Sequence, residues 1–244
     1  MRLRLKTKTF VTALMSIAVL AVVNTPAHAA FMAYICDDAL CTGGGDTIVT
    51  DQGVGDNFPG SALVGQINAG ALSVGGFTII TNIAQSKPLI GSSGLPELNI
   101  EFSAVTSDNL THTVYLYASD TGFSGDGLIT LSLSGNQPPP ASMNSVSGSL
   151  YGGMSNTNLN LSNVLLSVGP ASGSAYSLTS SALLSPSTNP FSLTAGVVIT
   201  RVAAGTTSGH LDAVVSSAVP EPATLALLGV GIAGIGFARR RRLN

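Results

Sequence analysis

The feature of the sequence that most constrains the fold is a series of short runs rich in β-branched and alternating apolar residues. Such runs are typical of β-strands, and between residues 30 and 217 no apolar pattern is sustained at helical spacing. Turn-forming glycine, proline and asparagine separate nearly all of the runs. The pattern predicts strands at residues 47–54, 61–67, 77–84, 97–106, 111–118, 128–134, 158–168, 176–184, 191–202 and 211–215.

About ten short strands without interleaved helices are typical of an antiparallel β-sandwich or jelly roll. A β-solenoid fits less well, because no fixed repeat period is visible. Alternation predicts that Tyr115 and Tyr117 share one face of their strand and that Val114 and Leu116 share the other. We therefore expect an all-β domain over residues 30–217, between a signal peptide at residues 1–29 and a sorting segment with a transmembrane helix at residues 218–244.

Charge is segregated along the chain, because eight of the ten basic residues lie near its two ends. The body between them has only Lys87 and Arg201 against eleven acidic residues, which is a net charge of −9. A surface of this sign repels phosphate groups, so a nucleic-acid-binding role is excluded.

The N-terminal segment has the three parts of a secretory signal peptide. A basic start is followed by the uncharged run 10–23, and Ala27 and Ala29 occupy the two positions that signal peptidase requires to be small. This pattern predicts export through the Sec translocon and cleavage after Ala29. An uncleaved anchor is the alternative, but an apolar helix of about 21 Å is short for a hydrocarbon core of about 30 Å.

The C-terminal segment combines a helix-breaking motif, an apolar span and a basic end. Its prolines end any helix that enters from the body, and the uncharged run 223–238 can form a helix of about 24 Å. Arginines at the far end of this helix keep that end in the cytoplasm, so the body lies on the outer side of the membrane. The motif is Val219, Pro220, Glu221 and Pro222, and the predicted cytoplasmic anchor is Arg239, Arg240, Arg241 and Arg242.

These residues resemble the PEP-CTERM sorting signal of Gram-negative bacteria that produce exopolysaccharide. The resemblance implies recognition of the Pro-Glu-Pro motif by an exosortase, a membrane-embedded cysteine protease-transpeptidase. It further implies an intermediate anchored in the inner membrane, a cut near residues 220–222, and delivery to the cell surface or extracellular matrix. An ordinary tail anchor is the alternative.

Cys36 and Cys41 are the two cysteines of the chain. Outside the cytoplasm two thiols this close are expected to form a disulfide. A metal pair is the alternative, but no histidine cluster accompanies them to complete a zinc site.

Residues that carry enzyme chemistry are scarce. After signal removal the histidines are His112 and His210, and neither lies in a recognisable catalytic motif. Glu97 and Glu101 would lie about 13 Å apart on one strand face, too far for a glycosidase pair. We predict a protein that is not an enzyme and needs no cofactor; a hydrolase whose site is assembled only by folding is a third hypothesis.

Calcium is the one ion for which the sequence offers candidates. Asp120 and Asp126 lie in the Gly-rich segment 119–127, which is expected to be a loop and could supply oxygen ligands. A plain turn is the preferred interpretation, because the segment does not match an EF-hand. Asp46, Asp51 and Asp56 recur at intervals of five, and solvated loops are preferred there too.

The function predicted from these features is a structural or adhesive role in an exopolysaccharide matrix or biofilm. The alternative is a secreted carbohydrate-binding β-sandwich module, with or without a dependence on calcium. The absence of tryptophan counts against sugar stacking, although tyrosines can replace it. Those tyrosines are Tyr34, Tyr115, Tyr117, Tyr151 and Tyr176.

Overall fold

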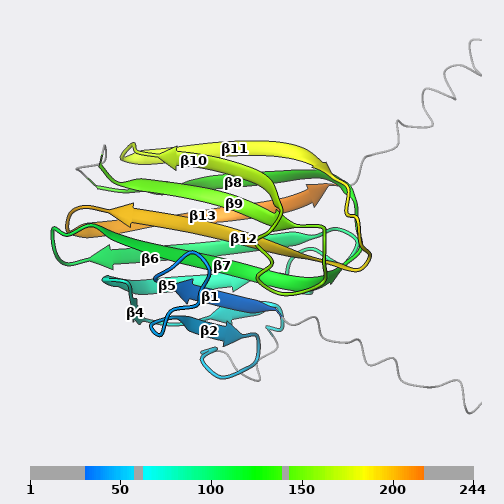
Figure 1. The fold of residues 1–244 in the computed structure, drawn as a ribbon, viewed down its shortest axis with the longest axis horizontal. Coiled ribbons are helices and arrows are strands. Elements are labelled where there is room, and N and C mark those ends of the chain that lie inside the picture. The colour runs from blue at the N-terminus through cyan, green and yellow to red at the C-terminus, as the bar shows by residue number, and fades with distance from the viewer. Residues whose placement is uncertain (1–30, 58–62, 139–142, 217–244) are drawn as a thin grey trace, which may run out of the picture.

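The computed structural model describes residues 31–57, 63–138 and 143–216 (Figure 1), and every regular element within these ranges is a β-strand. The predicted all-β class is therefore confirmed. The strands are β1 (Met32–Cys36), β2 (Thr47–Thr50), β3 (Gln66–Asn68), β4 (Leu72–Val74), β5 (Phe77–Gln85), β6 (Glu97–Thr106), β7 (His112–Phe123), β8 (Gly127–Asn136), β9 (Ser145–Gly152), β10 (Val164–Ala171), β11 (Ala175–Leu184), β12 (Phe191–Arg201) and β13 (Gly205–Ser216).

The strands form two antiparallel sheets that pack face to face as a sandwich (Figure 1). The first sheet has six strands in the order β10-β9-β12-β7-β1-β2. The second has seven: six lie in the order β11-β8-β13-β6-β5-β3, and the seventh, β4, pairs with β5. Neighbours in space are mostly distant in sequence, so the chain crosses repeatedly from one sheet to the other.

The core lies between the sheets and follows the alternation that the sequence predicts. On β6, residues Leu98, Ile100 and Phe102 are buried, and on β7 the residues Val114 and Leu116 face them in the same cluster. Tyr117 belongs to a second apolar cluster, which Tyr115 joins, on the outer face of the first sheet. The predicted division of β7 into two apolar faces is thus confirmed.

Several strand predictions are wrong, and each error has a local cause. Strands β1, β4 and β9 were not predicted; β9 is rich in serine and glycine, yet Val146, Gly148 and Leu150 point inward along it. The predicted strand 158–168 begins only at Val164, and of the described residues of the predicted strand 61–67 only Gln66 and Ile67 lie in a strand, β3; residues 61 and 62 lie outside the described residues.

Residues 119–123 form the end of β7 rather than a loop. Phe123 is fully buried there and its ring lies 6.1 Å from that of Phe191, so the strand continues to bring this side chain into the core. Burial of one large aromatic ring outweighs the turn propensity of Asp120 and Gly122.

Within the described residues, no helix is long and apolar enough to cross a membrane. The predicted transmembrane run 223–238 and the predicted signal peptide 1–29 both lie outside the described residues.

Candidate functional site

The two terminal signals lie outside the described residues. They comprise the signal-cleavage positions Ala27 and Ala29, the motif Val219–Pro220–Glu221–Pro222, and the arginines Arg239, Arg240, Arg241 and Arg242. The candidate site within the body is the outer face of the first sheet, where aromatic and acidic side chains gather.

Four tyrosines from three strands meet on this face and form what we call the tyrosine cluster: Tyr34, Tyr115, Tyr117 and Tyr151. Tyr34 on β1 is the register partner of Tyr117 on β7. Gly196 on β12 makes room for the rings, because a Cβ atom there would lie 2.6 Å from Cδ1 of Tyr117 and 3.6 Å from Cε2 of Tyr151. The sequence named these residues, but only strand pairing brings them together.

The tyrosine cluster has two buried members and two half-buried members. Tyr34 and Tyr117 are buried, whereas Tyr115 and Tyr151 are half-buried. The Tyr117 hydroxyl donates a hydrogen bond of 2.8 Å to the carbonyl of Ala39, and burial raises its pKa well above the ordinary value. The two half-buried rings are therefore the surfaces of the cluster that a ligand can reach.

Tyr176, the fifth tyrosine, lies elsewhere. It is buried on β11 of the second sheet, where its hydroxyl donates to the carbonyl of Ser208. Burial raises its pKa above the ordinary value as well. It cannot contribute to the tyrosine cluster.

The loop between β1 and β2 borders the tyrosine cluster and is closed by a disulfide. Cys36 and Cys41 are joined, with Cα atoms 5.2 Å apart, and both pack against the tyrosines. The turn between them exposes Leu40, which lines a surface depression together with residues 157–162. The loop thereby contributes one wall of a shallow concave surface.

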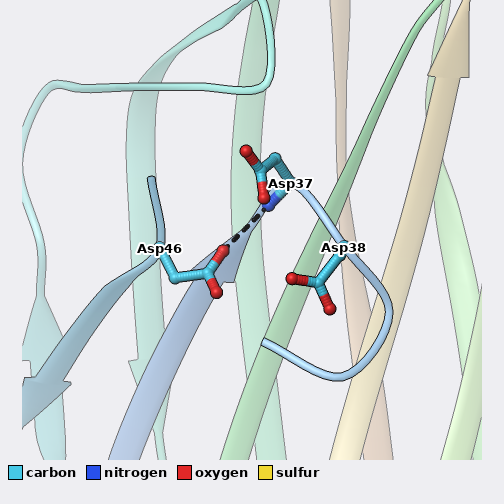
Figure 2. Close-up of side chains that lie close together, drawn as sticks. All are labelled: Asp37, Asp38 and Asp46. Carbon is cyan, nitrogen blue, oxygen red and sulfur yellow. Dashed lines mark hydrogen bonds between the residues drawn. The ribbon is translucent and has the colours of Figure 1, made fainter. Parts of the chain in front are cut away.

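Three carboxylates gather in the same loop, and we call them the acidic cluster: Asp37, Asp38 and Asp46 (Figure 2). One oxygen from each lies within 4.8 Å of the others. The backbone N–H of Asp37 donates a hydrogen bond of 3.1 Å to Oδ1 of Asp46, while Oδ2 of Asp46 is buried without a hydrogen-bond partner. Carboxylate oxygens are the ligands that Ca²⁺ prefers, so this donor set suits that ion chemically.

Asp38 is held in place by the backbone of its own turn. Its two oxygens accept hydrogen bonds from the N–H groups of Leu40, Thr42 and Gly43, at 2.8 to 3.0 Å. These bonds, that from Leu40 above all, lower the pKa of the carboxyl below its ordinary value. The carboxylate is thus kept ionised and oriented.

The acidic residues singled out from the sequence are distributed differently. Asp46 belongs to the acidic cluster, but Asp51 and Asp56 do not. Asp120 is buried on β7, where its Oδ2 accepts from Nζ of Lys87 at 2.7 Å. Asp126 is exposed and belongs to no group of three potential ligands among residues 31–57, 63–138 and 143–216. Calcium binding stays a prediction.

The histidines lie on the surface beside carboxylates. Nε2 of His112 is 2.8 Å from Oδ1 of Asp108. Nε2 of His210 is 3.3 Å from Oδ2 of Asp212, and Oγ of Ser134 lies 3.2 Å from the same nitrogen. Sequence reasoning missed this Ser–His–Asp set because pairing of β8 with β13 creates it.

This Ser–His–Asp set lacks the geometry of a catalytic triad. In a catalytic triad the serine and the carboxylate bond to opposite ring nitrogens. Here Ser134 is almost equidistant from both nitrogens, at 3.2 and 3.4 Å, and therefore lies on the axis of neither. The residues are polar contacts on the outer face of the second sheet.

Comparison with known proteins identifies one family motif. The model described as the PEP-CTERM protein-sorting motif matches residues 218–242, which confirms the resemblance drawn from the sequence. No match is found among curated protein sequences.

Similar solved structures are distant. One is the enzymatically active domain of tailspike protein 4 from bacteriophage CBA120, with 6% identity over 57% of this chain, 19% of that chain and a TM-score of 0.33. Another is a carbohydrate-binding module of the β-sandwich superfamily, with 12% identity, coverage of 76% and 84%, and a TM-score of 0.30. A third is the mannan-recognising module TmCBM27, with 10% identity, coverage of 62% and 86%, and a TM-score of 0.29. These TM-scores are too low for a fold or a ligand to be inferred from them.

Proposed function

We propose, from the PEP-CTERM protein-sorting motif that the chain carries at residues 218–242, that this is a non-catalytic exported protein and an exosortase substrate. The motif begins at residue 218, two residues after the end of β13 at Ser216. A cut at residues 220–222 therefore leaves both sheets on the same product. The sandwich is then delivered intact from an inner-membrane intermediate to the cell surface or extracellular matrix.

In that location the sandwich has a structural or adhesive role in the exopolysaccharide matrix. The outer face of the second sheet supports this proposal, because hydroxyl side chains line paired strands there. Thr130 on β8 lies 2.9 Å from Ser181 on β11, and Ser132 lies 3.5 Å from Thr179. Hydroxyl groups both donate and accept hydrogen bonds, so they can bond to the hydroxyl groups of a polysaccharide.

Replacing Pro220, Glu221 and Pro222 together by alanine tests the sorting proposal. We expect a larger species that stays in the membrane fraction on an immunoblot, because the tail is no longer recognised and cut. Pro186→Ala, a proline of a body loop, is the control and should be processed normally. An unchanged size and location of the triple variant would exclude exosortase processing at this motif.

Carbohydrate binding is a second candidate function, and the tyrosine cluster is the observation that favours it. Half-buried Tyr115 and Tyr151 offer ring surface beside the depression at Leu40. The acidic cluster lies in the same loop and would hold calcium if the module depends on that ion. Aromatic surface with a few polar groups beside it is a common composition of ligand sites.

The two half-buried tyrosines, Tyr115 and Tyr151, allow a direct binding test. We expect Tyr115→Ala and Tyr151→Ala each to weaken binding to the polysaccharide of the producing strain about fivefold, since loss of a stacked ring costs on the order of 1 kcal/mol. Binding is measured by pull-down, with calcium and with EDTA. Leu110→Ala, an exposed apolar residue of the loop between β6 and β7, is the control. Equal binding by all four proteins would contradict the carbohydrate proposal.

A further inference from the structure

Lys87 and Asp120 form an ion pair that joins the two sheets. Lys87 lies two residues after the end of β5 of the second sheet, and Asp120 lies on β7 of the first. Nζ of Lys87 is 2.7 Å from Oδ2 of Asp120, and the side chains are only 14% and 1% exposed. Lys87 is the only lysine between residues 31 and 216, so the body places its one amine against a carboxyl in the interior.

The surroundings of the pair are apolar on one side and hydrogen-bonding on the other. Nζ of Lys87 lies 4.0 Å from the centre of the Phe123 ring and also donates to the carbonyl of Thr121. The Ser86 hydroxyl donates to the same Asp120 oxygen at 2.6 Å. Burial lowers the pKa of Lys87, although Asp120 acts in the opposite direction. Removal of the Lys87 ammonium from water carries a desolvation cost, which favours the neutral amine.

A further carboxyl, that of Asp51, is linked to the backbone of Lys87 through Gly65. Its Oδ2 accepts a hydrogen bond of 2.8 Å from the N–H of Gly65. Gly65 in turn lies against the backbone of Lys87, since a Cβ atom there would be 2.7 Å from the Lys87 carbonyl oxygen. Burial raises the pKa of Asp51; the hydrogen bonds from Gly65 and Gln52 act in the opposite direction, and the charges of Asp56 and Asp120 add to the effect of burial. Asp51 is therefore biased toward the protonated form.

We propose that Lys87 and Asp120 condense to an intramolecular isopeptide bond that covalently joins the two sheets, with Asp51 as the proton-transfer group. The proposal stands on the burial of both side chains and on their 2.7 Å contact, and it does not depend on the proposed function. A buried amine, a buried carboxyl and a proton carrier are the groups that amide formation needs.

The condensation balances without an oxidant or a further reactant. The Lys87 ammonium first gives a proton to Asp120, leaving an amine and a carboxylic acid. Nζ then attacks Cγ of Asp120 and forms the C–N bond of a tetrahedral intermediate. Asp51 takes a proton from the nitrogen and returns one to the departing hydroxyl, so the C–O bond breaks and one water leaves. An ion pair with no net charge becomes a neutral amide.

The bond would close a ring between residues that are 33 positions apart. A covalent link of this kind restricts the unfolded chain, as a disulfide does. It would also prevent the two sheets from separating under load, which the small ring closed by Cys36 and Cys41 within a single loop cannot do.

Cleavage after glutamate tests the bond in the protein purified from its native host. Glu97 and Glu101 are the only glutamates between residues 31 and 216, and both lie between Lys87 and Asp120. After denaturation, reduction and digestion, we expect the fragment that ends at Glu97 and the fragment that begins at Phe102 to stay joined. Mass spectrometry should give the sum of their masses less one water. Two separate fragments with unmodified Lys87 and Asp120 would overturn the proposal.

Three variants test the assignment of each group. Lys87→Arg keeps a cation opposite Asp120 but has no nucleophilic amine, so its fragments should separate. Asp51→Asn should lose or greatly reduce the joined product while circular dichroism still reports a folded domain. Asp126→Asn removes an exposed carboxyl and should remain joined. Joined fragments from Lys87→Arg would place the link elsewhere, and full joining in Asp51→Asn would remove Asp51 from the reaction.

Discussion

Replacing Leu116 by alanine is expected to lower the free energy of unfolding by about 2–5 kcal/mol, as for other fully buried leucines. Leu116 lies in the middle of β7, between Ile35 of β1 and Val197 of β12 in the ladder, and no part of it reaches solvent. Its side chain belongs to the core shared with the second sheet. Truncation removes apolar contacts and leaves a cavity that strands held on both sides cannot close.

Urea unfolding of the mature protein, followed by circular dichroism, measures this change. Leu183→Ala is the matched control, because the chemical change is the same and Leu183 on β11 is 80% exposed. We expect the control to change the unfolding free energy by less than about 0.5 kcal/mol. Similar losses from both variants would show that Leu116 is not in a packed core.

Gly209→Val is expected to destabilise the sandwich by about 3 kcal/mol, at the upper end of overpacking costs. Gly209 lies on β13, where even a Cβ atom would be 2.4 Å from the carbonyl oxygen of Ser134 and 2.6 Å from the hydroxyl of Tyr176. The Ser134 carbonyl is part of the ladder between β8 and β13, so it cannot move aside without loss of pairing. Tyr176 is itself held by its hydrogen bond to Ser208.

Gly94→Val is the control for this second change. No atom lies within 4 Å of the position that a Cβ would take at Gly94, so the added side chain meets no obstacle. Thermal unfolding of the two variants should show a large fall in Tm for Gly209→Val and little change for Gly94→Val. A well-tolerated valine at position 209 would contradict the close approach of β8, β13 and Tyr176.

Glycines at closely packed strand positions, such as Gly209, are one reason why strand prediction from this sequence was incomplete. Where side chains alternate clearly, as in β6 and β7, the pattern predicted the strand, and for β7 it also predicted which residues share each face. In β9 the inward positions include Gly148. Glycine has a low β-strand propensity, and here it packs closely against the side chains of Leu211 and Val168. Only packing against larger neighbours makes such a segment a strand, and that packing is not written in the local sequence.

The sequence by itself determined the all-β class, the two faces of β7 and the PEP-CTERM motif, because each depends on the order of residues close together in the chain. The tertiary structure decided which tyrosines meet, that Asp37, Asp38 and Asp46 gather, and that Asp120 faces Lys87 rather than a solvated loop. The tyrosine and lysine contacts join strands far apart in sequence. Their partners are fixed by strand order and sheet packing, to which the whole chain contributes at once.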